Sequence, residues 1–267
     1  MTLARSSLAG AAATFLSAAA PAFAHAGFLV PLLDEADTSG KVLLSASFSD
    51  AFPEADITLK SDAWTIVSPT GEVMAFDKSA STASRTVLRA YLVDEGTYRL
   101  SSGERLGRIG EVARIDDAFV RLGSNGIAKE DLPDRAEILT SQTATVSDIY
   151  FSRGTPSAEV LDSRIGRLAI VPASDPTDFA PGDSLRVTIE FDGERLSGVP
   201  VTAFVPGGSR EEGLPETTFV TNEDGRVSLN CQTDGPHLLM VRHLALAPDD
   251  AETEVRSYTT TLTVICA

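Results

Sequence analysis

Short segments of alternating apolar and polar residues, separated by turn sequences, recur along this chain and predict a protein built from β-strands. Residues 41–48 (KVLLSASF) alternate as a strand with one buried face does. Residues 63–67 (AWTIV) and 72–76 flank a Ser-Pro-Thr-Gly turn and predict a hairpin. Sustained apolar repeats of helical period are nearly absent, and one short helix is predicted at residues 128–135.

Further strands are predicted before the middle of the chain. Residues 86–92 and 96–100 (GTYRL) surround the turn sequence Asp-Glu-Gly and predict a second hairpin. Residues 142–151 form a strand-like stretch that ends in the loop sequence SRGTP at 152–156.

The pattern is most regular after Gly166, where short strand-like segments alternate with Gly-containing turns. Seven such segments in about 100 residues are typical of an immunoglobulin-like sandwich. We therefore predict an all-β fold with two β-sandwich-like domains, an N-terminal β-rich domain at residues 25–160 and an immunoglobulin-like domain at 166–267. The seven predicted strands are residues 167–171, 184–191, 199–205, 217–220, 226–231, 237–243 and 257–265.

The first 24 residues have the layout of a secretory signal peptide. Arg5 is their one charged residue, residues 7–20 are small and apolar, and small residues occupy the last and third-last positions. No later stretch approaches the ~20 apolar residues of a membrane helix. We expect an exported periplasmic protein without a membrane span after cleavage.

The position of the cleavage decides the fate of one histidine. Cleavage after Ala24 would make His25 the mature N-terminus, with a free α-amine beside its imidazole, a pair that chelates metals. Cleavage after Ala26 fits the same rule and would discard His25. Both alternatives stay open, with the first favoured because Phe23 suits the end of an apolar region.

Charge and motifs exclude several functions. The formal net charge of −16 provides no basic field for a polyanion, which disfavours nucleic-acid binding. The chain contains no G-x-S-x-G motif and no phosphate-binding P-loop. Paired carboxylates are common, but in so acidic a chain they indicate solvated loops. We expect a protein that is not an enzyme.

Two cysteines close predicted strands of the second domain. Cys231 ends the strand RVSLNC and Cys266 ends TTTLTVIC, so a bridge is geometrically possible in an oxidising compartment. A disulfide is favoured over two buried thiols, and a two-thiolate metal site is disfavoured because no CxxC spacing is present.

The three histidines are the candidates for a transition-metal site. His237 and His243 bracket one strand, so they share a face but stand ~20 Å apart. Together they cannot hold one ion. We predict that His25 forms the site with whichever of these two histidines approaches the N-terminus, and that a carboxylate or water completes it. Imidazole and amine donors suit Ni²⁺ or Cu²⁺. Each histidine could instead be an ordinary packed or turn residue.

The chain resembles a domain-of-unknown-function family that includes the periplasmic accessory component of energy-coupling-factor-type nickel and cobalt uptake systems. The similarity covers essentially the whole mature chain and is most specific in the second half. The matching segments are AHAGFLVP (24–31), DIYFSRGTP (148–156), GRLAIVPASDP (166–176), FAPGDSLRVTIEFDGERLSGVPVTAF (179–204), TNEDGRVSLN (221–230), HLLMVRH (237–243) and SYTTTLTV (257–264).

The resemblance implies a periplasmic two-part β protein that serves transition-metal uptake, with recurrent histidines at the positions of His25 and His243. It therefore implies a site formed by His25 and His243, with His237 as the weaker candidate. The leading hypothesis is a protein that binds Ni²⁺ or Co²⁺, with Cu²⁺ as the second choice, and assists an inner-membrane metal permease. One alternative is an immunoglobulin-like interaction or envelope module without metal. Another is a copper carrier, because such carriers also have an N-terminal histidine on a β-sandwich.

Overall fold

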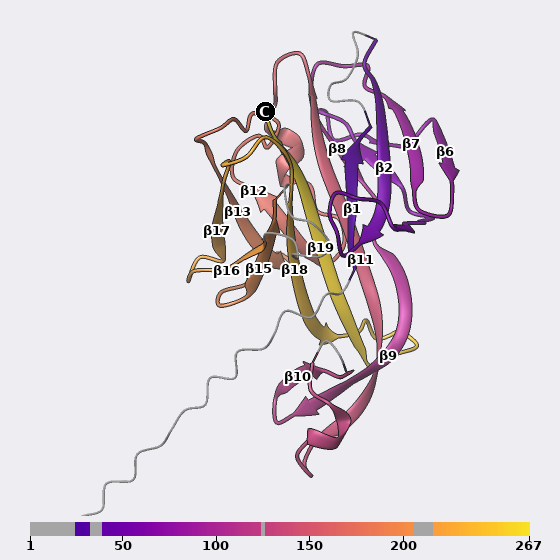
Figure 1. Ribbon diagram of the computed structural model, residues 1–267, viewed down its shortest axis with the longest axis vertical. Coiled ribbons are helices and arrows are strands. Elements are labelled where there is room, and N and C mark those ends of the chain that lie inside the picture. The colour runs from indigo at the N-terminus through magenta and orange to yellow at the C-terminus, as the bar shows by residue number, and fades with distance from the viewer. Residues whose placement is uncertain (1–24, 33–38, 124–125, 206–215) are drawn as a thin grey trace, which may run out of the picture.

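The computed structural model describes residues 25–32, 39–123, 126–205 and 216–267, and these residues are almost entirely in β-strands. The predicted signal segment lies outside the described residues. Within them, no helix has the length and apolar character needed to cross a membrane. The strands form three sheets that stack as layers (Figure 1). The predicted all-β fold is confirmed.

The first sheet is formed by the N-terminal strands. Its order is β1 (Ala26–Pro31), β2 (Lys41–Ser49), β7 (Thr86–Tyr91) and β6 (Lys78–Ser81), with β3 (Ile57–Thr58) paired to β2. Its inner face is covered by small and branched apolar side chains that pack on the central sheet. This packing makes the predicted N-terminal sandwich.

A central sheet of ten strands runs through both halves of the molecule. β11 pairs in parallel with β19 along residues 141–149, and this pairing joins the two halves. The order is β16 (Glu216–Val220), β15 (Pro200–Phe204), β18 (Gly235–Leu246), β19 (Val255–Cys266), β11 (Glu137–Arg153), β8 (Gly96–Ser101), β4 (Thr65–Val67) and β5 (Val73–Met74), while β9 (Arg105–Ile115) pairs with β11 and with β10 (Ala118–Arg121).

The third sheet completes an immunoglobulin-like sandwich. It contains β12 (Leu168–Pro172), β13 (Ser184–Phe191), β14 (Glu194–Arg195) and β17 (Arg226–Asn230). β12, β13 and β17 have the order A-B-E of that fold, and β16, β15, β18 and β19 opposite them have the order C′-C-F-G. All seven strands predicted after Gly166 are present.

The first and third sheets cover opposite faces of the central sheet. Alternate side chains of β18 demonstrate this, because successive residues of a strand point to opposite faces. Leu239 and Val241 are buried in the core beneath the third sheet. Leu238 and Met240 pack instead with Phe28 of β1.

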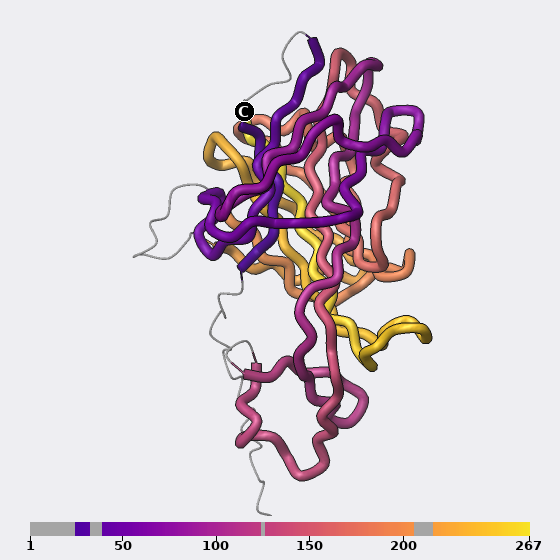
Figure 2. The backbone as a smooth tube through the Cα atoms, turned by 90° about the vertical axis from the view of Figure 1, so that its right-hand side faces the viewer, coloured from indigo at the N-terminus to yellow at the C-terminus, as the bar shows by residue number. Residues whose placement is uncertain are grey.

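A long extension projects beyond the two sandwiches. The strands β9 and β10 and the first part of β11 form it, and Figure 2 shows that it stands apart from the stacked sheets. The extension also contains η2 (Lys129–Asp131), a single 3₁₀ turn where the sequence predicts a helix over 128–135. That helix prediction is wrong, because Pro133 lacks the backbone donor that would continue the turn.

One of the two predicted hairpins is confirmed and the other is wrong. β4 pairs with β5 as expected. β7 pairs with β2 and β6, whereas β8 pairs with β11 and β4 in the central sheet. Leu88 of β7 and Leu100 of β8 face the same core from its two sides, so the turn between these strands connects two layers. The apolar pattern of each strand is the same whether the two strands pair as a hairpin or lie in two facing sheets, so the sequence does not distinguish these cases.

The predicted disulfide is present. Cys231 and Cys266 are bonded, with their Cα atoms 5.7 Å apart. Both residues are buried in the core of the C-terminal sandwich. The bond joins the end of β17 to the end of β19 and so links the two sheets of that sandwich.

Candidate metal centre

His25 lies next to the loop that follows β2 because β1 and β2 are antiparallel. The register pairs Gly27 with Phe48 and Ala26 with Ser49. One step further along the same register, His25 lies across from Asp50. The sequence at the two strand ends therefore brings an imidazole and a carboxylate together on the surface.

The loop after β2 brings a second carboxylate to the same place. Phe52 anchors this loop in the core, with its ring 5.1 Å from that of Phe28. The chain then returns to pair with β2, and the amide of Asp56 donates a hydrogen bond of 3.2 Å to Ser47 Oγ. Asp56 Oδ2 lies 3.6 Å from His25 Nε2.

The three side chains form a compact set of metal donors. One donor atom from each of His25, Asp50 and Asp56 lies within 4.8 Å of the others. Donors about 2.1 Å from a single ion stand about 3.0–4.2 Å apart, so small side-chain rotations suffice to bind one. All three residues are exposed, which permits those rotations. The donor set therefore fits a divalent cation.

The structure does not bring His243 to His25. His243 is on the face of β18 that carries Leu239 and Val241, and its ring lies 4.7 Å from that of Phe191 in the third sheet. β1 packs on the opposite face of β18. The predicted partnership of His25 and His243 is wrong, because the central sheet separates them.

His243 instead belongs to a polar and aromatic cluster at the edge of the C-terminal core. Arg167 donates hydrogen bonds of 2.7 and 2.5 Å to the Asp192 carboxylate and one of 2.9 Å to Tyr258 Oη. Its guanidinium also lies 4.6 Å from the Phe191 ring centre. Burial lowers the pKa of His243, with a smaller contribution from Arg167. This cluster is explained by packing and pairing.

His237 is a core residue. It is fully buried, and its Nδ1 lies 3.0 Å from the carbonyl oxygen of Gly235, to which it donates. The ring meets Phe179 edge-on at 6.2 Å. Burial lowers the pKa of this imidazole, so the neutral form is favoured. His237 is shielded from solvent in this fold. It is an ordinary packed residue, which was the alternative to a metal ligand.

Comparison with known proteins gives a family. A family model described as Domain of unknown function (DUF4198) matches residues 22–245. The chain belongs to this family. The DUF4198 match includes His25, Asp50, Asp56 and His243. No curated protein sequence matches the chain.

Two solved structures are similar to this DUF4198 protein at low identity. The D0-D1 domain of Intimin is 12% identical, with a TM-score of 0.23, and the match covers 86% of this chain and 93% of that one. A Salmonella alpha-2-macroglobulin mutant is 14% identical, with a TM-score of 0.23, and the match covers 93% of this chain but 15% of that one.

Sequence reasoning found His25 but missed both carboxylates of the centre. Asp50 and Asp56 are two of 38 acidic residues and form no recognisable motif. The usable signal is the pairing of β1 with β2, which places His25 across from Asp50. The local pattern does not encode that pairing, because residues 32–40 separate the two strands and no two-residue hairpin turn fixes their register.

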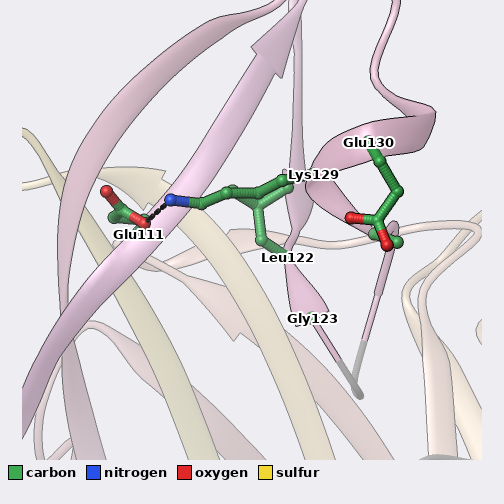
Figure 3. A pocket seen from close by; sticks show the side chains of 6 residues that line it. Glu111, Leu122, Gly123, Lys129 and Glu130 are labelled. Atoms are coloured by element: carbon green, nitrogen blue, oxygen red, sulfur yellow. Dashed lines mark ion pairs between the residues drawn. The ribbon is translucent and has the colours of Figure 1, made fainter.

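A surface hollow of about 690 Å³ on the extension has a different character (Figure 3). Its lining includes Glu111, Lys129 and Glu130. Lys129 forms an ion pair with Glu111, while Glu130 stands apart from them in the figure. Lys129 balances the charge of Glu111 and not that of Glu130, and no histidine is among the described residues that line the hollow.

Proposed function

We propose that this DUF4198 protein binds a divalent transition metal, Ni²⁺ or Co²⁺ first, and assists its uptake by an inner-membrane transporter. The single observation that carries the proposal is the convergence of His25, Asp50 and Asp56, with donor atoms within 4.8 Å of one another. The resemblance of the sequence to a nickel and cobalt uptake component supports the same ion class.

The donor set discriminates among metals by its chemistry. An imidazole nitrogen suits Ni²⁺, Cu²⁺ and Zn²⁺, whereas carboxylates also accept harder ions. Cleavage after Ala24 would add the α-amine of His25 to the set and shift it towards nitrogen. Two nitrogens and two carboxylates would then hold Ni²⁺ or Co²⁺, and Cu²⁺ is the alternative cargo.

Exposure of the centre suits a carrier that releases its cargo. The side chain of His25 is 43% exposed and that of Asp56 is 38% exposed, so water and a competing ligand both reach the ion. The net charge of −16 raises the local concentration of cations without selecting among them. An importer with a better donor set could therefore remove the metal.

Calorimetric titration of the exported, processed protein with Ni²⁺, Co²⁺ and Cu²⁺ tests the proposal. We expect one site per chain. His25→Ala should weaken binding at least about tenfold, because the only imidazole of the set is lost. Asp50→Asn and Asp56→Asn should each weaken it by a smaller factor, because an amide oxygen is a weaker ligand than a carboxylate.

His243→Ala is the matched control. It removes an imidazole on the far face of the central sheet, so metal affinity should stay unchanged. Affinity that falls in His243→Ala and persists in His25→Ala would overturn the assignment. Absence of binding at micromolar metal would overturn the proposed function itself.

A second candidate function is an interaction module that binds no metal. The observation that favours it is β16, which ends the central sheet among the described strands and keeps one edge without a paired strand. Val220 on this strand is 64% exposed. An extended peptide could pair with such an edge. Capture of a partner by metal-free protein, with the His25→Ala variant equally active, would favour this function.

A further inference from the structure

A pocket of about 290 Å³ lies between the first sheet and one end of the central sheet. The end of β1 (residues 30–32), the start of β18 (residues 235–236) and the end of β19 (Ile265) contribute to its lining. Two residues of the loop after β2 also border it. Segments that are far apart in the sequence therefore meet around this pocket, as they commonly do around small-molecule sites between two parts of a fold.

The walls of the pocket are mostly apolar and stiff. Apart from Ser45, Arg85 and Gly235, every described lining residue is apolar, and three of these residues are prolines, at positions 31, 53 and 236. The proline ring fixes the backbone angle φ, so these walls need little ordering when a ligand binds. The lining therefore favours a ligand with an apolar body.

Arg85 is the one charged residue among the described residues of the lining. It is half-buried, just before β7, and its backbone forms hydrogen bonds with Thr82. No carboxylate of the described part of the chain forms an ion pair with the Arg85 guanidinium. A guanidinium in apolar surroundings is stabilised by a carboxylate, whose two oxygens match two of its N–H groups.

A second polar group of the lining is a buried hydroxyl. Ser45 is paired with Val30 across β1 and β2, so both side chains are on the same face of the first sheet. Ser45 is 1% exposed, and its Oγ has no hydrogen-bond partner among the described residues. A buried polar group without a partner is costly, and a hydroxyl can turn its proton towards an acceptor that enters the pocket. An oxygen atom of a ligand would supply that acceptor.

The charge of the pocket distinguishes between classes of anion. The chain has a net charge of −16, and Arg85 supplies one positive charge at this place. One guanidinium balances one negative charge, as on a carboxylate. A phosphate monoester carries close to two negative charges at neutral pH, and its second charge would have no cation here. The pocket therefore matches a carboxylate better than a phosphate.

We propose that this pocket binds a small monocarboxylate with an apolar body. Arg85 binds the carboxylate, Ser45 donates a hydrogen bond to one of its oxygens, and the three prolines pack against the apolar body. The site needs no metal. It is separate from the metal centre, because His25 precedes Val30 by five residues along β1, which is about 16 Å in an extended strand.

Titration of the metal-free exported protein with benzoate tests this site. We expect saturable binding with a Kd below about 1 mM, as a small ligand in a preformed pocket can reach. Methyl benzoate lacks the charge and acetate lacks the ring, so each should bind at least about tenfold more weakly. Phenyl phosphate should also bind more weakly than benzoate, because its second negative charge is not balanced.

Two variants and one control assign the binding to these residues. Arg85→Gln should weaken benzoate binding at least about tenfold. Arg186→Gln makes the same change of net charge at an exposed position on β13 in the third sheet, so it should leave binding unchanged. Ser45→Ala should weaken binding about threefold without lowering the free energy of unfolding, because the hydroxyl it removes has no partner in the unliganded protein.

A measurement on the wild type does not depend on the folding of any variant. Crystals soaked in 4-bromobenzoate should show an anomalous bromine signal inside the pocket. A bromine signal only elsewhere, no saturable binding of benzoate, tighter binding of phenyl phosphate than of benzoate, or equal binding by folded Arg85→Gln would overturn the site. His25→Ala should bind benzoate as the wild type does, so failure of the metal centre and failure of this pocket are distinguishable.

Discussion

At the scale of single residues, the three histidines lie in three different environments. His25 is exposed beside carboxylates, His237 is fully buried, and His243 is half-buried beside an aromatic ring and a salt bridge. Their sequence neighbourhoods did not separate them. What separates them is the layer of the fold that each one faces.

The buried histidine predicts a stability that depends on pH. The pKa of His237 is lowered in the folded protein by burial, so the unfolded chain binds more protons below about pH 6.5. The free energy of unfolding should therefore be highest above that pH and fall as the pH drops towards the lowered folded value. His243 contributes in the same direction, because its pKa is also lowered.

Urea unfolding of wild-type protein and His237→Asn between pH 5 and pH 8 checks this. Asn can keep the donor to the Gly235 carbonyl but does not titrate. The variant should lose less stability on acidification than the wild type. If the unfolding free energy changes equally with pH in the two proteins, His237 is not the source of the pH dependence. His243→Asn then tests the second histidine in the same way.

At the scale of elements, a buried ion pair fixes β8 against β11 in the centre of the molecule. Arg99 Nη2 lies 2.5 Å from Asp148 Oδ2, with both side chains almost completely buried. Arg99 also donates a hydrogen bond of 2.6 Å to the carbonyl oxygen of Ser163, just after η3 (Glu159–Asp162). The pair therefore connects the shared sheet to the segment that leads into the C-terminal sandwich.

Removal of one partner of this ion pair should lower the free energy of unfolding more than removal of both charges. Arg99→Met leaves the Asp148 carboxylate buried without its cation, which typically costs about 3–5 kcal/mol of unfolding free energy. The double variant with Asp148→Asn carries no buried charge and should be more stable than Arg99→Met alone. Denaturant unfolding measures both. A double variant that is less stable than the single one would contradict the role of charge burial.

The disulfide acts on the same scale, between β17 and β19. It closes a loop with a sequence separation of 35 residues, for which chain entropy gives about 3–4 kcal/mol of stabilisation. The double variant Cys231→Ala, Cys266→Ala should have an unfolding free energy lower by about that amount. Reduction of the wild type should lower its Tm to about that of the double variant. An unchanged Tm after complete reduction would contradict a stabilising bond.

At the scale of the whole molecule, the sequence predicted strands and the C-terminal sandwich well but not the connection of the two halves. Turn sequences such as Asp192-Gly193 and Glu223-Asp224-Gly225 mark strand ends locally, so the seven final strands could be recognised. The parallel pairing of β11 with β19 joins residues more than 100 positions apart and has no local signal.

The candidate site was predictable only in part for the same reason. His25 has a distinctive place in the sequence, whereas Asp50 and Asp56 acquire meaning from the register of β1 with β2. His243 was chosen by resemblance. Its separation from His25 follows from the side of the central sheet that each strand packs against, which the period of two within a strand cannot reveal.

Anomalous diffraction from nickel-soaked crystals of the processed protein, recorded at the nickel absorption edge, tests the central claim most directly. The account predicts one strong peak within bonding distance of His25 Nε2 and the carboxylates of Asp50 and Asp56. A peak at His243 with none at His25, or no ordered nickel at all, would contradict it.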